Sequence, residues 1–172
     1  ICEAQHGFRK NRSCLTNLLD FFEAVAGEVD RGEPVDVLYF DFLKAFDRAP
    51  HQRLLLKLKA LGIEGRLLNW IREWLKERRQ RVVLGGECSD WTTVTSGVPQ
   101  GSVLGPVLFV IFINDIDEGI RSRILKFADD LNMMGKVTAQ EDIEQLKRDI
   151  DKLVEWSEHW QLSFNLDKCK VM

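Results

Sequence analysis

Two adjacent aspartates interrupt an otherwise apolar, strand-like segment, KFADDLNM, at residues 126–133. Burial of one unpaired carboxylate is costly, and burial of two neighbouring carboxylates is more so. In a straight strand Asp129 and Asp130 would also point to opposite faces. A hairpin whose tight turn falls at Ala128-Asp129 would bring both carboxylates to one end of a sheet. Taken alone, the segment fits a plain hydrophilic turn about equally well, because aspartate favours turns.

A third carboxylate lies at the end of another apolar segment. The sequence VDVLYFDF (35–42) is rich in β-branched and aromatic residues and predicts a buried strand that carries Asp41 near its end. If the two strands are neighbours, Asp41, Asp129 and Asp130 converge, and three carboxylates cannot all stay ionised there without cations. Such a set of hard oxygen ligands suits Mg²⁺, and a pair of these ions is the usual clamp for nucleotidyl transfer. The chain has no GxxxxGK[ST] motif, which excludes a P-loop enzyme.

Composition fits one globular domain, or one lobe of a larger one, with 172 residues and 45% hydrophobic side chains. The chain begins with Ile1, so a fragment or processed piece is expected. The net charge of -3 argues against a dedicated nucleic-acid binder, but the charge is unevenly distributed. Residues 53–81 hold nine Lys or Arg against three acids, and residues 139–160 hold seven acids against three bases. Scattered cysteines predict reduced thiols without a zinc site, and no apolar run is long enough to cross a bilayer.

The pattern of helices and strands favours an α+β fold with an antiparallel sheet, because the two kinds of element do not alternate strictly. The first helix, capped by Ser13 and running to about Asp30, is expected to pack through its apolar residues. That face consists of Leu15, Leu18, Leu19, Phe22, Val25, Ala26 and Val29. The later elements are expected to be helices over 50–62 and 64–80, a hairpin near 81–94, a helix from 102 or 103 to 116, strands over 122–127 and 131–134, a helix over 138–160, and a strand-turn-strand over 161–172.

Four segments resemble, in order, motifs A, B, C and D of reverse transcriptases: YFDFLKAFD, GVPQGSVLGP, KFADD and LSFNLDKCK. Together with QHGFRKNRSC, they look like the non-LTR retrotransposon type, of the jockey and CR1 kind, over nearly the whole chain. The resemblance implies a right-hand polymerase palm, an antiparallel sheet flanked by helices, with part of the fingers and no thumb. The implied divisions are partial fingers and a lead-in helix (1–34), the motif A strand of the palm (35–48), a helical and hairpin fingers insertion that ends in the motif B loop (49–101), and the rest of the palm with motifs B to D (102–172).

The resemblance also implies which residues hold metal. Asp41 matches the motif A ligand, Asp129 and Asp130 match the motif C pair, and the backbone carbonyl of Phe42 is a further candidate. Two Mg²⁺ ions are expected, with Mn²⁺ as a substitute, bridged by Asp41 and Asp129 with Asp130 assisting. Lys168 matches the motif D lysine that is proposed to protonate the leaving pyrophosphate. An ordinary solvated lysine fits the sequence about as well.

Nucleotide contacts are implied at three further positions. Phe46 matches the aromatic steric gate against a ribose 2′-OH, although core packing is the favoured reading of the bare sequence. Gln100 and Gly101 match motif B residues that contact the incoming nucleotide and the template, since glycines permit close backbone approach and a helix N-terminus offers amide donors. A simple turn before a core helix would explain the glycines but not the glutamine. Asp47 is expected to be a capping residue ahead of Pro50.

Several basic side chains are candidates for nucleic-acid contact, and a solvated face is the alternative for all of them. They are Arg9 and Arg12 in the GFR segment, and Arg72, Lys76, Arg78 and Arg79 in the basic cluster.

The implied function is RNA-directed DNA polymerase activity, a nucleotidyl transfer that uses an RNA template, a DNA primer and dNTPs. The remainder of a retrotransposon polyprotein, with the missing fingers, thumb and endonuclease, is an expected partner, and no membrane is. The resemblance implies an intracellular location, as a cytoplasmic ribonucleoprotein and in the nucleus. Two alternatives stay open: an inactive nucleic-acid-binding remnant, and a metal-dependent phosphohydrolase, which does not explain Gln100-Gly101 or the motif order.

Overall fold

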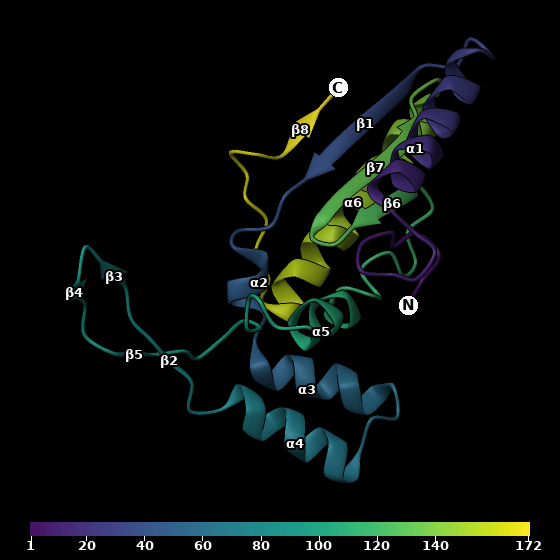
Figure 1. Ribbon diagram of the computed structural model, residues 1–172. Coiled ribbons are helices and arrows are strands. Elements are labelled where there is room, and N and C mark those ends of the chain that lie inside the picture. Colours follow the sequence, from purple (N-terminus) through teal and green to yellow (C-terminus); the bar gives the residue numbers. More distant parts are fainter.

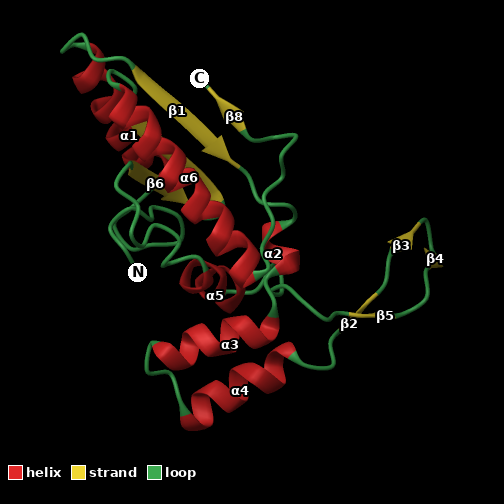
Figure 2. Cartoon of the chain, turned by 180° about the vertical axis from the view of Figure 1, so that it is seen from behind, coloured by secondary structure: helices red, strands yellow, loops and turns green.

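A four-stranded sheet forms the centre of the molecule in a computed structural model that describes residues 1–172 (Figures 1 and 2). Its strands are β1 (Val35–Phe40), β6 (Arg123–Phe127), β7 (Asp130–Lys136) and β8 (Lys170–Val171). The order is β6-β7-β1-β8, and every neighbouring pair is antiparallel. The predicted α+β class with an antiparallel sheet is confirmed.

Helices lie against both faces of the sheet, because successive strand residues point to opposite sides. Val37 and Met134 face α1, whereas Leu131 and Met133 belong to the larger core with α5 and α6. The helices are α1 (Cys14–Val29), α2 (Ala45–Arg48), α3 (His51–Ala60), α4 (Gly65–Leu75), α5 (Leu104–Phe112) and α6 (Gln140–Trp160). None of them is both long and apolar enough to span a membrane.

Helix α1 begins as predicted but packs through a different face. Ser13 caps it in a capping box: Ser13 Oγ accepts from the Thr16 N–H, and the Ser13 N–H donates to Thr16 Oγ1. The predicted packing face is wrong in large part: Leu15, Leu18, Leu19, Phe22 and Val29 are exposed. The stripe that meets the sheet contains Phe21, Ala24 and Val25. The helix has apolar residues on both stripes, so its periodicity alone could not tell which one lies against the strands.

Between motifs A and B the chain forms a helical pair and then a protruding arm (Figures 1 and 2). The arm consists of the short strands β2 (Arg79–Gln80), β3 (Val83–Leu84), β4 (Glu87–Cys88) and β5 (Thr92–Thr93). The hairpin predicted near 81–94 turns at Gly85-Gly86, whose φ values of 59° and 91° suit glycine. All four arm strands are exposed.

Two further features differ from what the sequence indicates. Lys57, one of the nine basic residues in 53–81, is buried, and its Nζ lies 4.5 Å and 3.9 Å from the ring centroids of Trp156 and Trp160. It donates to the Phe112 carbonyl oxygen at 2.5 Å and pairs with Asp115. The predicted motif B helix is also shorter than expected, because α5 ends at Phe112 and turns follow.

Candidate active site

Strand register brings the three aspartates to one end of the sheet. The β1–β7 pairing ends at Phe40 opposite Leu131, so Asp41 and Asp130 follow next to each other at that end. On the other side of β7, Phe127 pairs with Asp130, and Ala128-Asp129 form the two-residue turn that the sequence predicts. The hairpin thus places two adjacent carboxylates at the same end of the sheet, whereas in a straight strand they would point to opposite faces.

The carboxylates are close enough to affect one another's charge. Partial burial raises the pKa of Asp129, and the negative charge of Asp41 raises it further. The pKa of Asp130 is raised by desolvation, then by Asp129 and by Asp41. Lys168 opposes the rise at both aspartates. No three acidic, His or Cys side chains gather tightly enough to hold a metal ion by themselves, so the acids are neighbours rather than a closed cage.

Motif D lies directly against Asp41. Lys168 Nζ is 3.3 Å from Asp41 Oδ2, and Asn165 Nδ2 donates to the same oxygen at 3.5 Å. The Asn165 backbone N–H also donates to the Asp41 carbonyl oxygen at 2.8 Å. Lys168 itself stays 66% exposed, so it is free to move toward a ligand. The motif D resemblance singles out only Lys168, so the contacts of Asn165 with Asp41 were not predicted.

Two hydrogen bonds connect the motif B loop to Asp47 of motif A. Gln100 Nε2 donates to Asp47 Oδ1 at 2.8 Å, and Ser96 Oγ donates to the Asp47 carbonyl oxygen at 2.8 Å. A Cβ at Gly97 would lie 2.6 Å from the Asp47 backbone, which explains a glycine there. The predicted capping role of Asp47 is wrong, because the N-cap of α3 is Pro50 and no side chain caps it. Asp47 instead orients Gln100.

The two motif A phenylalanines have different surroundings. Phe42 is 3% exposed, and its ring stacks on Phe164 with centroids 4.7 Å apart. Phe46 is half-buried, stacks on Phe109 at 4.4 Å and meets Phe8 edge-on at 6.3 Å. Core packing therefore accounts for part of the Phe46 ring and leaves part of it accessible. In the motif B loop, exposed Gly101 has φ of 78°.

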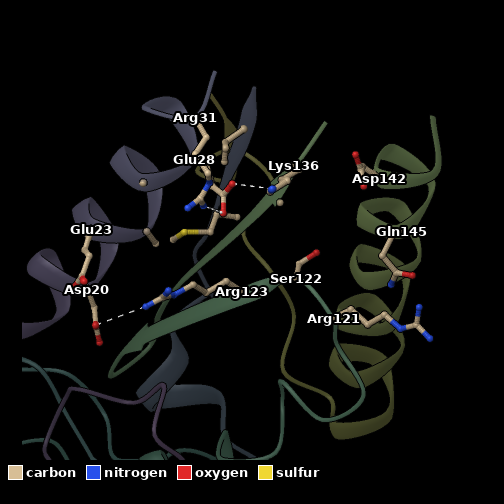
Figure 3. Close-up of a pocket in the computed structure, with 15 residues that line it drawn as sticks. Asp20, Glu23, Glu28, Arg31, Arg121, Ser122, Arg123, Lys136, Asp142 and Gln145 are labelled. Carbon is tan, nitrogen blue, oxygen red and sulfur yellow. Dashed lines mark ion pairs between the residues drawn. The ribbon is translucent and has the colours of Figure 1, made fainter. Parts of the chain in front are cut away.

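Two clefts flank the sheet. One, of about 600 Å³, is lined by Asp41, Asp130 and Lys168 among others. A larger one, of about 810 Å³, lies at the opposite end of β1 and β7, where Glu28 is held between Arg31 and Lys136 (Figure 3). The smaller cleft thus borders two of the three candidate aspartates, and Asp129 is not among its lining residues.

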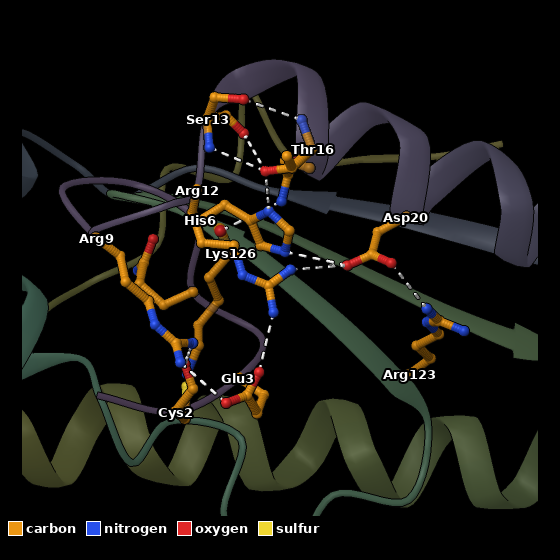
Figure 4. A network of polar contacts seen from close by, with 12 residues as sticks. Cys2, Glu3, His6, Arg9, Arg12, Ser13, Thr16, Asp20, Arg123 and Lys126 are labelled. Carbon is orange, nitrogen blue, oxygen red and sulfur yellow. Dashed lines mark hydrogen bonds and ion pairs between the residues drawn. The ribbon is translucent and has the colours of Figure 1, made fainter.

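The predicted nucleic-acid residues of the GFR segment are tied into internal ion pairs. Arg9 and Arg12 each lie 2.9 Å from the Glu3 carboxylate, and Arg12 is also 3.7 Å from Asp20 (Figure 4). These contacts partly neutralise both arginines, so a phosphate would have to compete for them.

The predicted residues of the basic cluster lie on α4 and the start of the arm, where they are exposed. Arg72 donates to Asn69, Lys76 pairs loosely with Glu73 and Glu77, and Arg78 lies over the Trp74 ring at 5.8 Å. Arg79 is exposed in β2.

A family model described as "Reverse transcriptase (RNA-dependent DNA polymerase)" matches residues 1–172. The chain is 31% identical to an RNA-directed DNA polymerase from the mobile element jockey of Drosophila funebris, a match that covers 98% of this chain and 19% of that protein. It is 29% identical to a probable RNA-directed DNA polymerase from transposon X-element of Drosophila melanogaster, with 96% and 19% covered. The chain thus spans about a fifth of the length of these relatives.

Solved structures with a similar fold include telomerases. One is telomerase from Candida albicans in complex with a TWJ fragment of telomeric RNA, at a TM-score of 0.68, 14% identity, and coverage of 98% of this chain and 32% of that one. Another is apo telomerase from Candida tropicalis, at 0.67 and 11% identity, with 98% and 33% covered.

Proposed function

Because the chain belongs to the reverse transcriptase family, we propose that it is the catalytic palm of an RNA-directed DNA polymerase from a non-LTR retrotransposon. RNA would be the template, a DNA strand the primer, and dNTPs the substrates. The observation that supports this most is the register that brings Asp41, Asp129 and Asp130 to one end of the sheet. The rest of a longer polyprotein would supply further nucleotide and duplex contacts.

Asp41, Asp129 and Asp130, with the Phe42 carbonyl, suit Mg²⁺ or Mn²⁺ because they offer hard oxygen donors with an excess of negative charge and only Lys168 as a cationic partner. Bound there, two such ions would supply Lewis-acid activation of the primer hydroxyl and neutralise charge on the triphosphate. The raised pKa values of Asp129 and Asp130 support this use, since a nearby cation would relieve their repulsion.

Lys168 is proposed as the general acid. Its exposed ammonium, anchored only to Asp41, can turn toward the leaving pyrophosphate and give up a proton as the bond to the α-phosphate breaks. Asn165 would keep its side-chain hydrogen bond to the Asp41 carboxylate when the lysine turns away.

Selection of the nucleotide is proposed to involve Phe46 and the motif B loop. The accessible part of the Phe46 ring would exclude a ribose 2′-OH, while its contact with Phe109 holds the ring in place. Gln100, oriented by Asp47, and Gly101 would line the path of the template and the incoming base. Arg9, Arg12, Arg72, Lys76, Arg78 and Arg79 remain proposed backbone contacts.

Primer extension on an RNA template with dNTPs and Mg²⁺, in wild type and Asp129→Ala, tests the proposal. Extension by wild type that is lost in Asp129→Ala is expected. Template and primer binding by both proteins without extension would instead favour a nucleic-acid-binding remnant. Phosphate release that needs no primer would favour a phosphohydrolase.

A further inference from the structure

The segment 4–7, ahead of α1, lies along the outer edge of β6. The Lys126 N–H donates to the Ala4 carbonyl oxygen at 2.8 Å, and the His6 N–H donates to the Lys126 carbonyl oxygen at 2.8 Å. Gln5 forms a parallel bridge with Lys126. The segment therefore runs beside the strand that leads directly into the Ala128-Asp129 turn.

The side chain of Gln5 holds both backbone polar groups of Ala128. Its Oε1 accepts from Ala128 N–H at 2.9 Å and from Gly7 N–H at 2.7 Å, and its Nε2 donates to the Ala128 carbonyl oxygen at 3.2 Å. Gln5 is 1% exposed, so water does not compete for these bonds. A buried amide that uses its acceptor and donor on one residue fixes the orientation of that residue's peptide groups.

Ala128 needs such support because of its own conformation. Its φ is 54°, in the left-handed region that residues with a side chain adopt rarely. Such a conformation persists when its surroundings enforce it. Gly7 contributes by close contact: a Cβ at this position would lie 2.3 Å from Ala128 N, so only glycine lets the segment come so near.

The segment itself is anchored to α1. His6 Nδ1 lies 2.9 Å from Thr16 Oγ1, and His6 Nε2 lies 3.2 Å from Asp20 Oδ2 (Figure 4). Its ring is fully buried. The residues on either side of His6 are therefore held against the turn rather than lying there loosely.

We propose that Gln5 and Gly7 are positioning residues for the catalytic carboxylates. By holding Ala128 left-handed, they fix the turn that presents Asp129 and Asp130 at the end of the sheet. Both residues act on the aspartates through Ala128. The proposal rests on the proposed polymerase function for its effect on catalysis, whereas its structural half stands independently of activity.

The test compares wild type with Gln5→Ala, Gln5→Glu and a control, Gln145→Ala. Gln145 also donates a side-chain amide hydrogen bond, to Asp149 on α6, but is remote from the turn. The first readout is hydrogen exchange of the Ala128 amide by NMR. Gln5→Ala is expected to speed this exchange at least about 10-fold, and Gln145→Ala to leave it unchanged. Gln5→Glu keeps the acceptor for Ala128 N–H and is expected to keep the amide protected.

The second readout is single-nucleotide incorporation. Gln5→Ala and Gln5→Glu are expected to lower kcat by about 10- to 100-fold with little change in KM for dNTP, because misplacement of catalytic groups by about 1 Å has effects of this size. Unchanged exchange at Ala128 in Gln5→Ala, or fast exchange in Gln5→Glu, would overturn the proposal. Activity no lower than in Gln145→Ala would overturn its catalytic half. If wild type extends no primer, the proposed function fails, and the exchange data still decide whether Gln5 holds the turn.

Discussion

Lys168 Nζ lies 3.3 Å from Asp41 Oδ2, so the cation that pairs with Asp41 belongs to the same motif that is proposed to supply the catalytic proton. In the proposed mechanism the lysine would have two partners in turn: Asp41 in the free protein, and pyrophosphate during the reaction. A divalent cation at Asp41 would take the place of the ammonium and release it toward the substrate.

Replacement of Lys168 should separate its proposed role as proton donor from its competition with Mg²⁺ at Asp41. Lys168→Ala is expected to lower kcat by about 100-fold or more, because general acid catalysis contributes on that scale. It should also lower the Mg²⁺ concentration for half-maximal rate, because Asp41 loses a competing cation. Lys168→Arg should lower kcat but keep the wild-type Mg²⁺ requirement, since arginine stays charged and does not give up its proton. Incorporation rates across a Mg²⁺ titration measure both effects. Lys170→Ala, which removes a nearby charge, is the control, and a Lys168→Ala profile identical to it would contradict the assignment.

Removal of a motif C carboxylate should stabilise the fold while it abolishes activity. The pKa of Asp130 is raised in the folded state, so its ionised form is penalised there and the cost is present above the folded pKa. Asp130→Asn is therefore expected to have a higher Tm than wild type at pH 7 without divalent ions. The difference should disappear at low pH, where the wild-type carboxyl is protonated in both states. Thermal unfolding at several pH values checks this.

The pKa of Asp149 is shifted in the opposite direction from that of Asp130, so its replacement should have the opposite effect on stability. Its burial raises the pKa, but hydrogen bonds from Ser122 and from the Arg121 backbone outweigh this and lower it. The stability that it contributes is present above the unfolded pKa and is lost as pH falls through the folded pKa. Asp149→Asn is expected to lower the Tm at pH 7. A change in Tm of the same sign for Asp130→Asn and Asp149→Asn would show that burial and charge repulsion at the turn do not penalise ionised Asp130.

The Asp47–Gln100 hydrogen bond should make the effects of substitutions at the two residues on KM for dNTP non-additive. Asp47→Ala and Gln100→Ala are each expected to raise KM for dNTP, and the double variant should be little worse than either, because each single change already frees the loop. Coupling of about 0.5–3 kcal/mol is usual for residues in direct contact. Steady-state kinetics of the four proteins measure it. Strictly additive effects would mean that Asp47 does not orient Gln100 in the working enzyme.

Lys57 should make the free energy of unfolding depend on pH in the alkaline range. Burial lowers its pKa to about 8, against an ordinary value of 10.5. Between these values the unfolded chain binds more protons than the folded one, so the Lys57 contribution to unfolding free energy rises with pH from about 8 to about 10.5. Urea unfolding of wild type and Lys57→Met at pH 7 and pH 9.5 should show a smaller gain in the variant. Lys59→Met, at an exposed position of α3, should keep the wild-type gain.

The sequence predicted the end of the sheet that carries the three aspartates better than it predicted how the helices pack. The motif C turn, the antiparallel class and the cap of α1 follow from short-range patterns: turn chemistry, strand alternation and a capping residue. Each depends on residues within a few positions of one another. Such features are readable without knowledge of the tertiary structure.

Contacts between distant segments were not readable in this way. Lys57 is buried because Trp156 and Trp160, about a hundred residues later, surround it. Gln5 reaches Ala128 across 123 positions. The exposed apolar stripe of α1 depends on which side of the helix the sheet meets. Periodicity and local propensity carry no information on any of these three choices.

The central claim is that the strand ends carrying Asp41 and Asp129 form the metal site of a polymerase. Calorimetric titration with Mn²⁺, in wild type and in the double variant Asp41→Asn with Asp129→Asn, tests it most directly. Wild type is expected to bind Mn²⁺, and the double variant to lose that binding while it stays folded. Equal Mn²⁺ binding by the two folded proteins would contradict the claim.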